Sequence, residues 1–213
     1  GDLAEKLYLR AIDQVHRVSS CRVAEATKLL ENIFRSVNIA LVNELKVVYG
    51  AMDIDINEVI NAAATKPFGF MPFRPGPGLG GHCIPIDPHY LSWKLKTLDY
   101  DARFIQLAGE INTAMPRHVL KLVTDGLNQQ QKALNGSKVL ILGVAYKKDV
   151  NDVRESPALD ILQLLEESGA ITDYFDPNVE SIFWNRSNIS SINKLDEKGL
   201  SGYDACIIVT DHS

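Results

Sequence analysis

The sequence predicts an α/β protein in which an all-helical part is followed by a doubly wound α/β unit. Helical periodicity fills most of residues 22 to 130, whereas apolar runs of strand type flank one amphipathic helix after residue 136. The order strand, helix, strand, with a long link to one more strand, is typical of a parallel sheet with crossover connections. The sequence therefore places a domain boundary near residue 136.

The first elements precede the long helical segment. Residues 3 to 12 form a short predicted helix with apolar residues near one face, and Ser19 or Ser20 could cap the helix that follows. The chain begins without Met and inside a helix, and it ends on a strand. We therefore expect a fragment at both ends.

The helix predicted over residues 22 to 49 is the longest element. Apolar residues recur in it at spacings of three and four, no proline interrupts it, and Gly50 ends it. It exceeds the usual length of a globular helix. It should therefore form the spine of its domain, and it could form a dimer interface.

Shorter elements follow the long helix. Asp53 or Asp55 caps a helix over residues 56 to 65, which Pro67 stops. A loop rich in glycine and proline then occupies residues 66 to 88.

The remaining elements change from helix to strand. Two more helices lead to a turn at Asn135 and Gly136, and a continuous apolar run then predicts a strand buried on both faces. Pro157 lies in the first turn of the next helix, and Gly169 lies at its end. In order, the ranges are 88–98 and 102–130 for the helices, 137–147 for the strand, 156–170 for the third helix, and 171–177 and 203–210 for two further strands.

Composition indicates an ordinary globular protein. The chain has 213 residues, of which 46% are hydrophobic and 23% charged, with a net charge of −5. This length is enough for one large or two small domains. The negative charge gives no basic footprint for nucleic acid, and the longest apolar runs are too short to span a bilayer. No secretory leader opens the chain, so we expect a cytoplasmic protein.

The three cysteines, at positions 21, 83 and 206, are too widely spaced for a disulfide framework or a zinc site. We therefore expect reduced thiols and no metal site. Cys21 and Cys206 are interpreted as small buried hydrophobic residues, the latter inside a strand core.

Cys83 differs because it lies in PGPGLGGHCIPIDP, residues 75 to 88, a stretch with four prolines and four glycines. The glycines before it let the backbone approach a ligand and expose amide donors, which could lower the pKa of the thiol or stabilise an oxyanion. Asp87 follows closely enough to share a turn. The residues alone leave two interpretations open, a nucleophile and a structural thiol.

Two other groups of polar residues could contribute to a site. Lys28 and Asn32 are one turn apart on the long helix and point the same way, which suits either a site or a solvated polar face. Residues 143 to 156 follow a strand and precede a helix, where ligands bind in open α/β sheets. Lys147 and Arg154 could hold a phosphate there, unless acidic residues of the same loop neutralise them.

Three segments together resemble the UDP-glucose/GDP-mannose dehydrogenase family: KLLENIFRSVNIALVNEL, GLGGHCIPIDP and GVAYKKDVNDVRESPALDIL. They follow the order and spacing of that family, and the resemblance covers nearly the whole chain. The HCIPIDP motif is most similar to the branch that oxidises UDP-N-acetyl-D-glucosamine, -mannosamine or -galactosamine at C6. UDP-glucose dehydrogenases typically have Ser where His82 stands.

The resemblance implies a division into domains. Family members have an N-terminal NAD-binding Rossmann domain, a central helical dimerisation domain and a C-terminal UDP-binding domain. Residues 1–20 would be the tail of the first, residues 21–135 the central domain with the catalytic cysteine, and residues 136–213 a truncated, Rossmann-like UDP-binding domain. The glycine fingerprint for NAD is absent, so the main NAD-binding domain would lie outside this chain, and the chain alone should be inactive.

The resemblance also implies a reaction, the NAD-dependent four-electron oxidation of the C6 hydroxyl of a UDP-N-acetylhexosamine to the uronic acid, for surface polysaccharide synthesis. Cys83 matches the catalytic cysteine, which would form a thiohemiacetal and then a thioester. Lys28 and Asn32 match the pair that stabilises oxyanions. Asp87 matches the aspartate that positions or activates water.

Binding residues are implied in the same way. Those on the substrate side are Arg74, Gly78, Gly80, Gly81, Tyr146 and Lys147, and Arg154 matches an arginine on the cofactor side. The implied partners are a UDP-sugar and a second copy of the chain, paired through the long helix. Lys66 lies near the family's subunit-crossing arginine. The role of His82 and the sugar epimer stay open, as do two alternatives: a UDP-glucose or GDP-mannose 6-dehydrogenase, and a non-catalytic nucleotide-sugar-binding or dimerisation module.

Overall fold

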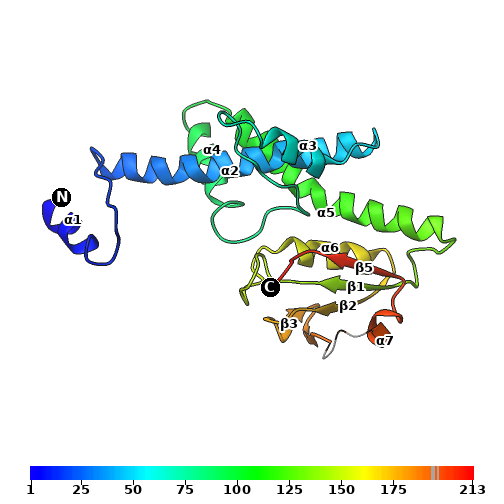
Figure 1. The fold of residues 1–213 in the computed structure, drawn as a ribbon. Helices are drawn as coiled ribbons and strands as arrows, with labels where there is room; N and C mark the ends of the chain where they lie inside the picture. Colours follow the sequence, from blue (N-terminus) through cyan, green and yellow to red (C-terminus); the bar gives the residue numbers. More distant parts are fainter. Residues whose placement is uncertain (193–194, 196) are drawn as a thin grey trace.

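Two long helices frame the first part of the computed structural model, which describes residues 1–192, 195 and 197–213. Helix α2 (Cys21–Gly50) packs against α5 (Arg103–Gln129). The shorter helices α3 (Ile56–Ala63) and α4 (Asp87–Lys96) pack on α2, and α4 also contacts α5 (Figure 1). The residues between α3 and α4 form the predicted loop rich in glycine and proline.

Capping side chains explain where these helices begin. Ser20 accepts a 3.3 Å hydrogen bond from the Val23 amide at the start of α2. Asp55 accepts a 2.9 Å hydrogen bond from the Asn57 amide at the start of α3. The predicted bounds of α2 and α5 are confirmed to within one residue, and Pro116 lies buried inside α5 without ending it.

The N-terminal segment is less regular than predicted. Helix α1 spans Asp2–Tyr8 and therefore ends four residues before the predicted end at residue 12. No residue between 1 and 20 is buried, so no packed apolar face extends the helix. The segment stands beyond the start of α2, and Arg17 pairs with Asp2 and Glu5 within it (Figure 1).

The second part is a parallel sheet of three strands. The strands are β1 (Lys138–Leu142), β2 (Ile171–Phe175) and β5 (Ala205–Ile208), in the order β2-β1-β5. Helix α6 (Pro157–Glu167) connects β1 to β2. Because the chain then returns to the other side of β1, the sheet has the predicted doubly wound topology. The predicted strand over 137–147 ends at Leu142.

The link between β2 and β5 contains elements that the sequence did not predict. Strands β3 (Ser181–Trp184) and β4 (Ser187–Ser190) form an antiparallel hairpin, and the short α7 (Glu197–Leu200) follows. Asn185 and Arg186 form the two-residue turn, and both have positive φ, 46° and 68°. A two-residue turn with positive φ at both positions matches the twist of a hairpin.

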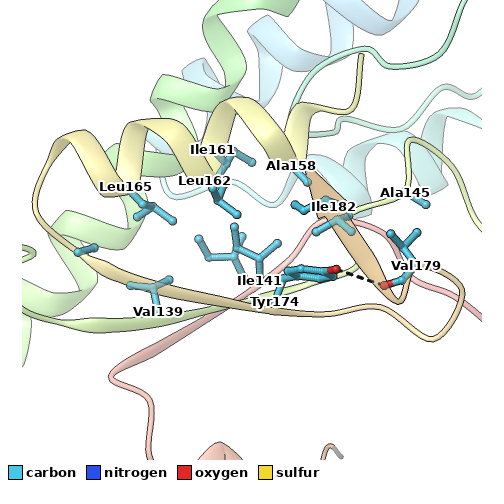
Figure 2. Packing of buried hydrophobic residues seen from close by; sticks show 13 residues of the cluster. Val139, Ile141, Ala145, Ala158, Ile161, Leu162, Leu165, Tyr174, Val179 and Ile182 are labelled. Carbon is cyan, nitrogen blue, oxygen red and sulfur yellow. Dashed lines mark hydrogen bonds between the residues drawn. The ribbon is translucent and has the colours of Figure 1, made fainter. Parts of the chain in front are cut away.

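The core of the second part lies between the sheet and α6 (Figure 2). Val139, Leu140 and Ile141 are fully buried, as predicted for a central strand with both faces covered. Side chains of α5 also pack on this core, so α6 lies against α5 as well as against the sheet (Figure 1). The fully buried members on α6 are Ala158, Ile161, Leu162 and Leu165.

The expected burial of two cysteines is wrong. Cys21 and Cys206 are both exposed. Ala205 and Ile207 pack toward the core, and because side chains alternate along a strand, Cys206 points to the opposite face of the sheet. No described helix combines the length and apolar character that a membrane span needs.

Candidate functional site

The loop that carries Cys83 lies at the junction of the two parts. Cys83 is exposed, and its carbonyl accepts a 2.8 Å hydrogen bond from the Asp87 amide. This bond closes a turn that leads directly into α4, which begins at Asp87. The turn therefore fixes the thiol and the carboxylate on one short segment, as expected from their spacing.

Asn32 joins this segment to α2. Its side chain is fully buried, and Nδ2 donates a 2.7 Å hydrogen bond to Asp87 Oδ2. Asn32 Oδ1 is the buried side-chain atom for which the described residues supply no hydrogen-bond partner. A buried acceptor without a partner is costly, so this oxygen is suited to a donor from a bound molecule or a water.

Lys28 is not brought into this contact. It lies one turn before Asn32 on α2, but its ammonium is exposed and lies 3.5 Å from Glu31 Oε2. An exposed ion pair of this kind contributes only about 0–1 kcal/mol, so the side chain can exchange this partner for another at little cost.

A loop of the second part meets the Cys83 loop. The Gly81 amide donates a 3.4 Å hydrogen bond to the Arg154 carbonyl, and His82 Nε2 lies 3.3 Å from Asp152 Oδ2. These contacts bring together residues 143–154 and residues 75–88, called the cysteine segment from here on, which are far apart in the sequence. His82 therefore has a defined place as a bridge between the two parts.

Arg154 and Asp152 form a pair in the loop after β1. Arg154 Nε and Nη2 donate hydrogen bonds of 2.9 and 2.7 Å to Asp152 Oδ1 and Oδ2, respectively. Hydrogen bonds from the Arg154 side chain and backbone hold the pKa of Asp152 well below its usual range, so this carboxylate stays charged at neutral pH. Arg154 is exposed and its Nη1 group makes no bond to Asp152, so the guanidinium retains donors for another acceptor.

Three glycines allow the close approach of the loops. A Cβ atom at Gly80 would lie 2.8 Å from the Cβ of Tyr146 and 2.9 Å from the Glu155 carbonyl oxygen. Gly81 has φ of +88°, and a Cβ there would lie 2.8 Å from the Tyr146 ring. A Cβ at Gly78 would meet Pro157 at 3.3 Å. The approach that these glycines permit here is to the protein's own second part.

The other predicted binding residues are spread over several elements. Arg74 points to α3, where it donates to the side chain of Asn61 and, at 3.5 Å, to the carbonyl of Asn57. Lys147 is exposed beside Tyr146. Lys66 lies over the ring of Phe68, 5.9 Å from its centroid. The structure thus brings Asn32, Cys83, Asp87, Tyr146 and Arg154 to one region, and it turns Arg74 toward α3.

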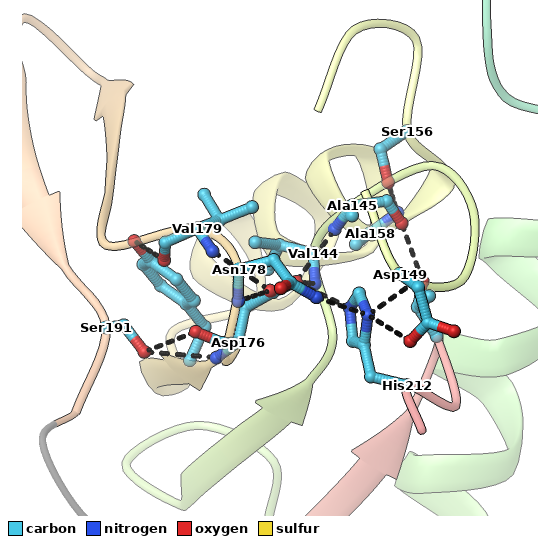
Figure 3. A network of polar contacts seen from close by, with 12 residues as sticks. Val144, Ala145, Asp149, Ser156, Ala158, Asp176, Asn178, Val179, Ser191 and His212 are labelled. Carbon is cyan, nitrogen blue, oxygen red and sulfur yellow. Dashed lines mark hydrogen bonds and ion pairs between the residues drawn. The ribbon is translucent and has the colours of Figure 1, made fainter. Parts of the chain in front are cut away.

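A buried polar network fixes the loop after β1 (Figure 3). Asp176 lies at the carboxyl end of β2, and its Oδ2 accepts hydrogen bonds from the amides of Val144 at 2.7 Å and Ala145 at 3.0 Å. His212 Nε2 lies 3.1 Å from the same oxygen, and His212 Nδ1 accepts from the Asp149 amide at 3.0 Å. Ends of all three parallel strands therefore meet where ligands bind in doubly wound sheets.

A cavity of about 170 Å³ lies between the cysteine segment and α5. Gly78 and Ile84 line it from the loop, and Ile105, Gly109 and Asn112 line it from α5.

Among the described residues, no group of three His, Cys, Asp or Glu side chains is arranged to hold a metal ion.

Sequence reasoning did not identify three buried polar residues that shape this region. They are Asn43 and Asn112, which face each other between α2 and α5, and Asp176. A signal existed for the two asparagines, because an amide inside an otherwise apolar helix face needs a buried partner. Asp176 follows a strand directly, and that position at the edge of a sheet was the available signal.

Comparison with known proteins matches both parts of the chain. The central-domain model of the UDP-glucose/GDP-mannose dehydrogenase family matches residues 22–114, and the UDP-binding-domain model of the same family matches residues 140–213. The UDP-N-acetyl-D-glucosamine 6-dehydrogenase of Pseudomonas aeruginosa is 34% identical over 100% of this chain and 50% of its own length. The UDP-N-acetyl-D-mannosamine dehydrogenase of Methanococcus maripaludis strain C7 is also 34% identical, over 100% of this chain and 46% of its own length.

Solved structures agree with this match. The UDP-D-ManNAc dehydrogenase of Pyrococcus horikoshii superposes with a TM-score of 0.86 at 34% identity, over 99% of this chain and 47% of that chain. A UDP-glucose dehydrogenase of Pyrobaculum islandicum gives a TM-score of 0.85 at 26% identity, over 100% of this chain and 49% of that chain. The chain spans about half the length of the curated relatives it matches. It belongs to the UDP-glucose/GDP-mannose dehydrogenase family, of which it carries the central domain and the UDP-binding domain.

Proposed function

We propose that the protein containing this chain is a UDP-N-acetylhexosamine 6-dehydrogenase that oxidises the C6 hydroxyl to the carboxylate through Cys83. The observation that carries the proposal is the contact between the cysteine segment and the loop after β1, made through His82–Asp152 and Gly81–Arg154. A nucleotide held by that loop would have its sugar near the thiol. The names of the two curated relatives above support an N-acetylated sugar.

The residues of this chain have distinct parts in the proposed reaction. The Cys83 thiol adds to the C6 aldehyde and forms a thiohemiacetal, which keeps the carbon bound until it is oxidised to a thioester. Water then cleaves the thioester, releases the acid and restores the thiol. Asp87, oriented by Asn32, positions that water, and Lys28 stabilises the oxyanions after leaving Glu31.

NAD, held mainly by a domain outside this chain, would accept the hydrides of both oxidation steps. Arg154 is our candidate for a contact from this chain, because its exposed guanidinium retains free donors beside the cysteine segment. We propose that residues 1–20 belong to that cofactor domain, since none of them is buried here. Residues 21–135 and 136–213 are then the central and UDP-binding domains.

We also propose a homodimer through α2. Five apolar side chains along this helix stay 41–66% exposed although they repeat at spacings of four and seven residues: Val23, Leu30, Phe34, Leu41 and Val48. They lie opposite the face that carries the buried Asn32 and Asn43. An apolar stripe of this length on a monomer surface is typical of an interface between subunits.

The test uses the full-length protein. UDP-N-acetylglucosamine, UDP-N-acetylmannosamine, UDP-N-acetylgalactosamine, UDP-glucose and GDP-mannose are each supplied with NAD, and NADH absorbance is followed. We expect turnover with an N-acetylated sugar and two NADH per product. We expect the Cys83→Ala variant to lose turnover with that sugar. Turnover only with UDP-glucose or GDP-mannose, or turnover that survives Cys83→Ala, would overturn the substrate and the mechanism respectively.

A further inference from the structure

We propose that Asn43 is a positioning residue that anchors the cysteine segment to α2, with Asn112 orienting its amide. Asn43 is fully buried, and Asn112 is 4% exposed. The Gly76 amide donates a 2.8 Å hydrogen bond to Asn43 Oδ1. The importance of this anchor for turnover rests on the proposed role of Cys83, whereas the anchor itself can be tested without turnover.

Backbone groups on either side of the Asn43–Asn112 pair determine how the two side-chain amides are oriented. Asn43 must present its oxygen to the Gly76 N–H, so its nitrogen donates to Asn112 Oδ1 at 2.9 Å. Asn112 then donates through Nδ2 to the Ser36 carbonyl at 3.1 Å. An amide N–H can only donate and a carbonyl can only accept. A flip of either side chain would therefore oppose like groups in a buried site.

The second anchor of the same segment is Asn32. Asn32 and Asn43 are eleven residues apart in α2, about three turns, so they share a face and lie about 16 Å apart along the axis. Asn43 holds Gly76, and Asn32 holds Asp87 at 2.7 Å. If extended, the segment between these contacts would span about 36 Å, more than twice the distance of about 16 Å between the two asparagines along the helix axis. The segment therefore forms a closed loop that is fixed at both ends. Cys83 lies in that loop.

The two anchors have different consequences. Asn32 contacts Asp87 directly, which we place in the reaction, whereas Asn43 acts only through the backbone of Gly76. Without Asn43, the half-buried Gly76 amide and the buried Asn112 Oδ1 would both lose their partners. Among the described residues, the bond at Asp87 would then be the remaining hydrogen bond between residues 76–87 and the first part, and the distance from the thiol to the sugar would vary more.

The test compares three variants in the full-length protein: Asn43→Ala, Asn43→Asp and Asn38→Ala. Asn38 is the control, because it lies on the same helix and its 2.7 Å hydrogen bond to the Phe34 carbonyl stays within that helix. Hydrogen exchange of the backbone amides in residues 75–87 is measured well below the unfolding temperature. We expect at least tenfold faster exchange in Asn43→Ala and unchanged exchange in Asn38→Ala.

The aspartate variant separates anchoring from stability. Asn43→Asp retains an acceptor for the Gly76 amide but loses the donor to Asn112, so it should be less stable overall yet keep its loop protected. If Asn43→Ala does not fold, Asn112→Ala provides the same readout, because it leaves the Asn43 amide without its orienting partner. Equal loop exchange in Asn43→Ala and Asn38→Ala, or equal loosening in the alanine and aspartate variants of Asn43, would overturn the proposal. Exchange needs no turnover, so a failure of the proposed reaction would remain distinguishable.

Discussion

Asn32 Nδ2 donates a 2.7 Å hydrogen bond to Asp87 Oδ2, and this bond joins the middle of α2 to the first turn of α4. It leaves the other carboxylate oxygen of Asp87 and the buried Oδ1 of Asn32 available to a bound molecule. Because the Asp87 amide also closes the turn at the Cys83 carbonyl, the thiol and the carboxylate keep a fixed relation to α2.

The first prediction concerns the carboxylate of Asp87. In the full-length protein, Asp87→Asn should lower kcat by about 10²–10⁴-fold while KM changes little, because the amide can still bond to Asn32 but cannot accept a proton. Initial rates followed by NADH absorbance give both constants. Asp125→Asn is the control, since Asp125 forms a surface pair with Lys121 on α5. Equal kcat in the two variants would show that Asp87 has no part in the reaction.

The second prediction concerns the contact between the two loops. Gly80→Ala would place a Cβ atom 2.9 Å from the Glu155 carbonyl, which is backbone and cannot move aside easily. We expect a loss of about 1–3 kcal/mol in the free energy of unfolding. Gly126→Ala is the matched control, because nothing lies within 4 Å of its added Cβ inside α5. It should gain about 0.5–1 kcal/mol from helix propensity.

Urea unfolding of both variants measures these changes. A Gly80→Ala variant as stable as the original protein would mean that the two loops separate without cost. In that case the contact between Gly81 and Arg154 would not fix the geometry of the site.

The elements predicted well are those with a strong local signal. Helix α2 follows from apolar periodicity and a capping serine, and β1 follows from a continuous apolar run. The β3–β4 hairpin has neither signal, because three of the four β4 residues are Ser or Asn and its turn is also polar. Its strands are specified by pairing with each other, which periodicity along the chain does not reveal.

The candidate site was predictable in its residue types and not in its contacts. The cysteine segment and the loop after β1 were both identified from the sequence, yet the His82–Asp152 contact joins residues 70 positions apart. The Asn43–Asn112 hydrogen bond joins positions 69 apart. Such contacts depend on how segments distant in the sequence pack against one another, and local propensity carries no information about that packing.

The third prediction concerns the apolar stripe of α2. Leu30→Glu and Leu41→Glu each introduce a charge into this stripe. The leucine side chains that they replace are 66% and 51% exposed, respectively, in the single chain. A buried, unpaired charge at an interface is costly, so we expect the dimer of the full-length protein to dissociate at least a hundredfold more readily.

Sedimentation equilibrium measures this dissociation, and circular dichroism confirms that each subunit stays folded. Phe183→Glu is the control, because Phe183 is 75% exposed on β3, away from α2. If all three variants associate as the original protein does, α2 does not form the interface.

The fourth prediction concerns Asp176 and acid stability. Burial raises the pKa of Asp176, but hydrogen bonds from the amides of Asn178, Val144 and Ala145 outweigh it, so the pKa lies below its ordinary value. A carboxyl group whose pKa is lowered by folding stabilises the folded state at pH values above its pKa in the unfolded chain, which is about 3.9. That contribution is lost as the pH falls through the folded-state pKa. Asp176→Ala should therefore cost about 3–5 kcal/mol at pH 7 and progressively less below pH 4.

Urea unfolding at several values between pH 7 and pH 2.5 tests the sign of this effect. The difference between the original protein and Asp176→Ala should be largest at pH 7, because the charged carboxylate then satisfies the buried amides of Val144 and Ala145. Asp125→Asn should show no comparable difference, since its carboxylate is half exposed and forms a surface pair with Lys121. A cost that stays constant down to pH 2.5 would mean that Asp176 stabilises the loop after β1 by shape and not by charge.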